Sequence, residues 1–373
     1  MAAKAKEHQI ELIRIIACFL VIMAHSQIVV MNGINMDYGR LVISTAIADD
    51  VPLFLLVTGF LFFGRVKSNE DIAPTFSYKI KSFFTNIYIP TILYILISIF
   101  FRHYNSTATS LANADWNYLV RFIFRLAPGD HLWYICTYMS FVFFFPMLAF
   151  VCQDAPEKNK LRRTLLLISL TASVIADVQY FFRWLMLDID RFLWGYCTIL
   201  LILGYELSLF IKKWNGSKFK LALYGIAIYL IGFSIKFGLQ IYMFHAYNEI
   251  NNRFRWLQCT PCFVTAIGLF ILVYAIGTAV RKESVGSRLI NFFGSCTFAI
   301  YLFHFLVIIQ TGSWRQVLFT KFSGCNSFAT AVGYYAIYAT AVFFTTFVIA
   351  YIFKLFTDNT VKRLLGPKPN SQR

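Results

Sequence analysis

Charged side chains are scarce in this sequence. Asp, Glu, Lys and Arg make up 14% of its 373 residues, whereas hydrophobic residues make up 58%. A soluble domain carries about 25% charged residues, so this composition excludes an ordinary soluble protein and indicates an integral membrane protein. No polar stretch is long enough for a separate soluble domain, and we therefore treat residues 1–373 as one membrane domain.

Two kinds of motif are missing as well. No glycine-rich loop of the type that cradles nucleotide phosphates is present, which argues against ATP-driven chemistry. The cysteines are scattered, and the only close pair is Cys259 and Cys262. They are typical of small apolar packing residues, so we predict no metal or redox site. The first apolar run lacks a small-residue cleavage site and carries Arg14 in its core, so we expect it to be retained.

Long hydrophobic runs, by contrast, are abundant. A helix that crosses a membrane needs roughly 20 apolar residues, and the runs predict an all-α, polytopic bundle of about ten helices. Most Lys and Arg residues between the runs fall on the side that holds both chain ends, so the positive-inside rule predicts that both termini are cytoplasmic. Topology then explains the net charge of +16, and we predict no nucleic-acid partner. The predicted spans are residues 9–31, 44–64, 82–102, 131–151, 164–182, 192–211, 221–243, 258–280, 290–310 and 328–356.

Two ionisable side chains lie inside the first run. Arg14 and His25 are eleven positions apart and, at about 100° per residue, share one helical face with Glu11. Ionisable groups inside a membrane usually face the bundle interior. A neutral imidazole accepts protons or acts as a nucleophile, so we predict a polar pathway with His25 as the reactive group. The alternatives are a packing role for His25, and an Arg14 that extends to the cytoplasmic interface or meets Glu206 in the sixth span.

Two further histidines reach a similar depth. His304 lies in the ninth span, and His131 opens the fourth span in the sequence His-Leu-Trp. If the helices bring them together with His25, three imidazoles would lie in the outer half of the membrane, where an acceptor could bind. Trp133 next to His131 is also typical of an interfacial anchor.

Carboxylates within the spans predict two more contacts. Asp49 and Asp50 enter the second span from outside, where either could orient the imidazole of His25 or remain solvated. Asp177 and Lys236 fall at comparable depths in the fifth and seventh spans, and they predict a structural ion pair.

In several of its motifs, the chain resembles the acyltransferase-3 family of multi-pass membrane acyltransferases. The resemblance extends over the whole chain. The motifs that carry it are Arg14-x10-His25, the apolar segment 51–64 with Gly59, the basic stretch from Tyr78 to Pro90, His131-Leu-Trp133 and Tyr301-Leu-Phe-His304.

This resemblance implies transfer of an acyl group, usually acetyl, from cytoplasmic acetyl-CoA to a hydroxyl of a cell-surface polysaccharide or its lipid-linked precursor. The reaction would take place in the inner membrane, with Arg14 and His25 required for activity. The residues expected to bind the acceptor are His131, Trp133, His304, Asp49 and Asp50. The basic clusters, which topology alone would also explain, suit the phosphates of the donor. The residues expected to hold these phosphates are Lys79, Lys81, Arg281, Lys282 and Arg288.

The sequence departs from the family pattern in three ways. Pro52 stands where many members have Asp, so no carboxylate role carries over to this position. Lys79 and Lys81 replace arginines, which weakens the case for bidentate phosphate contacts. We also expect no C-terminal hydrolase-like domain of the kind that some members have. A proton-coupled exporter of a polysaccharide, lipid-linked sugar or small acid is the alternative, because such carriers also need ionisable groups within their spans.

Overall fold

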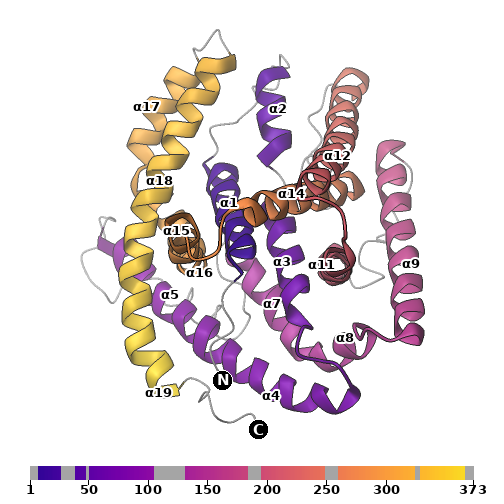
Figure 1. The fold of residues 1–373 in the computed structure, drawn as a ribbon. Coiled ribbons are helices and arrows are strands. Elements are labelled where there is room, and N and C mark those ends of the chain that lie inside the picture. Colours follow the sequence, from indigo (N-terminus) through magenta and orange to yellow (C-terminus); the bar gives the residue numbers. More distant parts are fainter. Residues whose placement is uncertain are drawn as a thin grey trace.

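The computed structural model describes residues 7–26, 38–47, 50–104, 131–183, 195–247, 259–323 and 328–365. Every regular element in these ranges is helical, so the predicted all-α class is confirmed. Figure 1 shows helix α18 along one side of the bundle and α9 along the other, with α1, α3 and α14 between them.

The helices follow the chain with short connections. Their bounds are α1 His8–His25, α2 Tyr38–Ile47, α3 Asp50–Phe62, η1 Asn69–Asp71, α4 Ile72–Phe83, the π-helical η2 Phe84–Tyr88, α5 Ile89–Tyr104, α7 Trp133–Phe143, α8 Phe145–Val151, α9 Pro156–Phe181, α11 Gly195–Lys213, α12 Lys218–Tyr247, α14 Thr260–Ala279, α15 Val285–Gly294, α16 Thr297–Gln310, α17 Gly312–Ser323, α18 Phe328–Thr357, η4 Asp358–Lys362 and α19 Arg363–Leu365.

The number of spans agrees with the sequence, but two spans are bent. Within the described ranges, eight helices are long and apolar enough to cross a membrane, and two bent helix pairs raise the number to ten. The pairs are α7 with α8, at 68°, and α15 with α16, at 59°. The predicted spans over 131–151 and 290–310 correspond to these bent pairs. Pro146 accounts for the first bend, because proline lacks an N–H and clashes with the preceding turn.

Two features were not predicted. The helical run that contains the predicted third span begins before residue 82, because α4, η2 and α5 follow one another without a break from Ile72. Helix α17 was not expected, since its sequence is too polar for a span. It forms beside α16 and α18 and contacts both of them.

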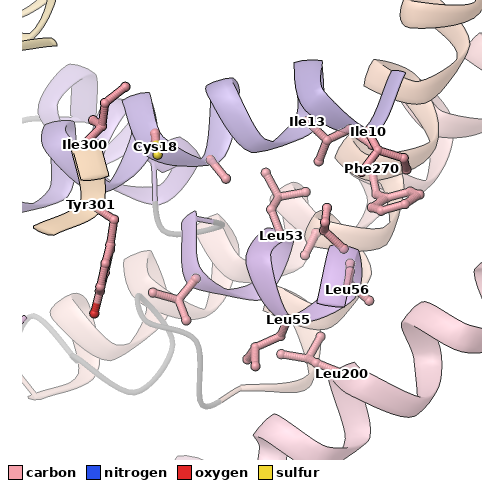
Figure 2. Close-up of a cluster of buried hydrophobic side chains, with 14 of the residues drawn as sticks. Ile10, Ile13, Cys18, Leu53, Leu55, Leu56, Leu200, Phe270, Ile300 and Tyr301 are labelled. Carbon is pink, nitrogen blue, oxygen red and sulfur yellow. The ribbon is translucent and has the colours of Figure 1, made fainter. Parts of the chain in front are cut away.

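Helix α1 occupies the centre of the bundle. It contacts α2, α3, α14, α15, α16 and α18. Figure 2 shows Ile10 and Ile13 of α1 directed toward Leu53 of α3 and Phe270 of α14, and all four side chains are buried. Lipid tails are as apolar as these side chains, so close packing rather than removal from water stabilises the cluster. The predicted polar face of α1 is thereby held inside the protein.

Glycines allow α3 and α11 to touch through their backbones. A Cβ atom added at Gly59 would lie 1.8 Å from the carbonyl oxygen of Leu201, and one added at Gly204 would lie 2.2 Å from that of Leu56. Small residues permit such close approach between membrane helices. This contact fixes the position of α3, which forms one wall of the site described below.

Arg162 of α9 ties three helices together and is fully buried. Its Nε donates to Glu206 Oε1 of α11 at 2.6 Å. Its Nη1 donates to the carbonyl oxygens of Val151 and Gln153, each at 3.2 Å. The predicted contact between Glu206 and Arg14 was therefore wrong. The depth of Glu206 was compatible with either arginine, and the lateral placement of α9 decided between them.

The second predicted ion pair involves two buried residues. Asp177 Oδ2 accepts a hydrogen bond from the backbone N–H of Thr260 at 2.8 Å, where it compensates the positive end of α14. Lys236 of α12 is fully buried. Their pairing with each other stays a prediction.

Candidate active site

Three histidines from distant parts of the chain lie together. His25 ends α1, His131 lies two residues before the start of α7, and His304 lies in α16. The ring centroids of His25 and His304 are 5.2 Å apart, and those of His131 and His304 are 5.5 Å apart. The ring of Phe305 stacks on that of His131 at 4.8 Å. The fold thus supplies the juxtaposition that the sequence left open, and the roles of the three imidazoles stay predictions.

Tyrosines hold this histidine cluster in place. Tyr94 Oη lies 3.3 Å from His131 Nε2, and Tyr301 Oη donates to the backbone carbonyl of His131. The backbone carbonyl oxygen of Tyr301 lies 2.7 Å from His304 Nδ1. His131 and His304 are buried, whereas His25 is half-buried. Among the described residues, no group of three or more His, Cys, Asp or Glu is arranged to hold a metal ion.

A cavity of about 320 Å³ leads toward the histidine cluster. We call the end of the bundle with the start of α1 and the end of α18 the inner end, because the charge distribution predicts that it faces the cytoplasm. The cavity begins there and reaches Tyr301, whose ring centroid is 5.9 Å from that of His304. Its polar lining residues are Arg14, Thr58, Asn86, Tyr134, Tyr138, Ser295, Thr297, Tyr301, Lys354 and Thr357.

Two cationic side chains line the cavity, and each has an acidic neighbour. Arg14 Nη1 donates to Glu11 Oε1 at 3.1 Å, and the Arg14 side chain is 34% exposed. Lys354 Nζ lies 2.7 Å from Asp358 Oδ2. Glu11 engages one N–H of the Arg14 guanidinium, a group with five donors, so others remain for a ligand in the cavity. Arg14 therefore lines the cavity, and the alternative that it extends to the cytoplasmic interface stays a prediction.

The wall opposite Arg14 is built from α3 and α7. Tyr134 Oη and Thr58 Oγ1 are 2.8 Å apart, and both residues line the cavity. Trp133 opens α7, and its ring centroid lies 6.3 Å from that of Tyr134. Asp50 is buried at the start of α3. Asp49, the other predicted partner of His25, lies outside the described residues.

The basic residues expected to bind the donor lie away from the cavity. Lys79 Nζ lies over the ring of Phe62, 3.8 Å from its centroid. The remaining four are exposed, one on α4 and the others in or beside the turn between α14 and α15, namely Lys81, Arg281, Lys282 and Arg288. A phosphate-binding role for these residues stays a prediction.

Sequence reasoning missed several residues of the cavity. The positive-inside rule was sufficient to explain Lys354 in the sequence. Asp358, one helical turn later, is nevertheless placed to form an ion pair with it. Tyr134 was grouped with the interfacial aromatic residues. Asn86 carried no signal, because only the meeting of η2 with the inner end of α18 turns it into a lining residue.

Together, these features define a polytopic membrane protein with a cavity, partly lined by polar side chains, inside its helix bundle. A family model described as an acyltransferase domain matches residues 7–355, and the chain belongs to this acyltransferase-3 family. It is thus a membrane acyltransferase, which removes the main argument for the alternative of a proton-coupled exporter. Neither the curated proteins nor the solved structures contain a match to this chain.

Proposed function

We propose that this protein transfers an acetyl group from acetyl-CoA to a hydroxyl of a cell-surface polysaccharide or its lipid-linked precursor, in the inner membrane. The observation that carries this proposal is the cavity between Arg14 and Tyr301. Two cations line it toward the inner end, and the histidine cluster adjoins its other end. A donor from the inner side and an acceptor from the outer side would then meet at His25.

The size of the cavity decides which part of the donor it accepts. Its volume of about 320 Å³ is at the low end of the range for ligand pockets, which is roughly 300–1,000 Å³. The narrow arm of acetyl-CoA fits such a space, whereas its nucleotide stays outside. There the exposed side chains of Lys81, Arg281, Lys282 and Arg288 would attract the phosphates.

Arg14 and Lys354 favour a donor that carries negative charge or a polarised carbonyl group. The free N–H groups of Arg14 can bind a phosphate or the thioester oxygen, and charge-assisted bonds of this type are roughly twice as strong as neutral ones. The carboxylates of Glu11 and Asp358 hold both side chains in place before the donor arrives.

His25 then carries out the chemistry by one of two routes. In the first, its neutral ring takes the proton of the acceptor hydroxyl, the oxygen attacks the thioester carbon, and the coenzyme leaves as a thiolate that is reprotonated on the inner side. In the second, the unprotonated ring nitrogen attacks the thioester carbon, the C–S bond breaks and the coenzyme leaves as a thiolate that is reprotonated on the inner side. The acetyl group then passes from the ring to the hydroxyl oxygen, and the hydroxyl proton returns to the ring. His131 and Trp133 would contact the sugar on the acceptor side.

The test is transfer of radiolabel from acetyl-CoA in inverted membrane vesicles that contain wild-type protein, His25→Ala or His245→Ala. His245 is an exposed histidine of α12 outside the site, so it provides the matched control. We expect alkali-labile label in glycan with wild-type protein and the control, and a loss of at least about 100-fold with His25→Ala. Transfer at the wild-type rate by His25→Ala would refute the chemistry, and no transfer by wild-type protein would refute the reaction.

A further inference from the structure

The hydrogen bonding of His304 leaves one of its ring nitrogens available. Nδ1 lies 2.7 Å from the carbonyl oxygen of Tyr301, and a carbonyl only accepts, so Nδ1 carries the ring proton. Nε2 is then the basic nitrogen of a neutral imidazole. It is completely buried and has no hydrogen-bond partner among the described residues. A buried acceptor in this state is destabilising, and such atoms in native proteins require an explanation.

The neighbour of this nitrogen is His25. The two rings are 5.2 Å apart between centroids and inclined at 47°. His25 is the half-buried member of the pair, so it is the one that can touch substrate while His304 lies behind it. Hydrogen bonds between catalytic groups are often long or poorly aligned without substrate and tighten only when the complex forms.

We propose that His304 is the positioning residue for His25 and that its Nε2 accepts an N–H of the His25 ring in the working complex. This inference rests on the proposed function, in which His25 is the reactive group. A reactive base is commonly oriented by a third group in this way.

The resulting chain of groups runs from the Tyr301 carbonyl through His304 to His25. The carbonyl holds the Nδ1 proton of His304, and His304 Nε2 holds the proton on one nitrogen of His25. The other nitrogen of His25 would thereby stay unprotonated, so that it can take a hydroxyl proton or an acetyl group in the working complex. Because the ring of Tyr301 also lines the cavity, one residue links the donor chamber to the reactive histidine.

Two substitutions of His304 distinguish a role in orienting His25 from a role in packing alone. In His304→Asn, the amide nitrogen occupies the place of Nδ1 and keeps the bond to the Tyr301 carbonyl, but nothing remains at the Nε2 position. In His304→Gln, the amide oxygen reaches the Nε2 position and can accept from His25, while the bond to Tyr301 is lost. The two variants therefore exchange one contact for the other at similar volume.

The assay is acetyl transfer to glycan in membrane vesicles, with kcat and KM for acetyl-CoA determined for each variant. We expect His304→Gln to stay within about tenfold of the wild-type kcat and His304→Asn to lose about 100-fold. KM for acetyl-CoA should be the same in all three proteins, because Arg14 and Lys354 are untouched.

The proposal is overturned if His304→Asn is as active as or more active than His304→Gln. It is also overturned if the losses fall on KM instead of kcat. If His304→Asn does not fold, the Gln variant decides alone. Although His304→Gln lacks the contact with Tyr301, a kcat near that of wild type for this variant supports the proposal. A large loss of kcat in this variant refutes it. Absence of transfer by the wild-type protein would instead refute the proposed function, and the role of His304 with it.

Discussion

Substitution of Gly59 by Ala should loosen the bundle and impair catalysis at the same time. The new Cβ would lie 1.8 Å from the carbonyl oxygen of Leu201, and real Cβ atoms essentially never come closer than 3.0 Å to such an atom. Because the obstacle is backbone, α3 and α11 must separate by about 1 Å. Overpacking of this kind costs about 1–3 kcal/mol. We expect a lower unfolding temperature in detergent micelles, measured by the loss of helical circular dichroism.

The same displacement moves the wall of the cavity. Thr58 precedes Gly59 on α3, and its bond of 2.8 Å to Tyr134 would be stretched or broken. A misplacement of about 1 Å can lower a catalytic rate about 100-fold, so acetyl transfer should fall far more than stability alone explains. Gly204→Ala acts at the same helix contact. The double variant should therefore lose less unfolding free energy than the sum of the losses in the two single variants.

Gly238→Ala is the matched control for these variants. No atom lies within 4 Å of the position of its Cβ, so helix α12 accommodates the methyl group. Alanine favours a helix over glycine by up to about 1 kcal/mol, so this variant should be as stable as wild type or slightly more so. If Gly59→Ala unfolds at the temperature of Gly238→Ala and keeps wild-type activity, the backbone contact between α3 and α11 is not what holds the site.

Two further predictions concern charged residues. Arg162→Ala leaves Glu206 and two backbone carbonyl groups without their donor, so we expect a loss of about 3–5 kcal/mol in unfolding free energy. The exposed Arg163→Ala should stay within about 0.5 kcal/mol of wild type, and equal stability of the two variants would refute the role of Arg162. Lys354→Met should raise KM for acetyl-CoA about three- to tenfold with little change in kcat, whereas Lys282→Met should raise this KM by a smaller factor. A larger increase of this KM in Lys282→Met than in Lys354→Met would indicate that the main contact with the donor lies at the surface instead of in the cavity.

Tyr301 has more connections in the site than any sequence pattern indicated. Its ring lines the cavity, its hydroxyl donates to the His131 carbonyl, and its own carbonyl binds His304. A displacement of α16 would therefore change the donor chamber and the histidine cluster together. This coupling would suit the proposed reaction, in which donor and acceptor come from opposite sides of the membrane.

The sequence alone determined the protein class and most of the architecture. Membrane spans need long apolar runs whatever their surroundings, so hydropathy predicted ten segments, and each has a counterpart among the described helices. The helical period placed Arg14 on the same face as Glu11, and the structure pairs these two residues. Such properties depend on neighbours along the chain, which a sequence displays directly.

Contacts between helices were decided only by the tertiary structure. Depth in the membrane made Glu206 a plausible partner of Arg14, but the lateral packing of α9 gave it to Arg162. The bends between α7 and α8 and between α15 and α16, the lining of the cavity by Lys354, and the convergence of the histidines depend in the same way on how helices pack side by side. Periodicity fixes which face of a helix is polar, but not which other helix that face meets. For this reason His25 could be predicted from the sequence as the reactive histidine, whereas its proposed positioning residue, His304, could be inferred only from the fold.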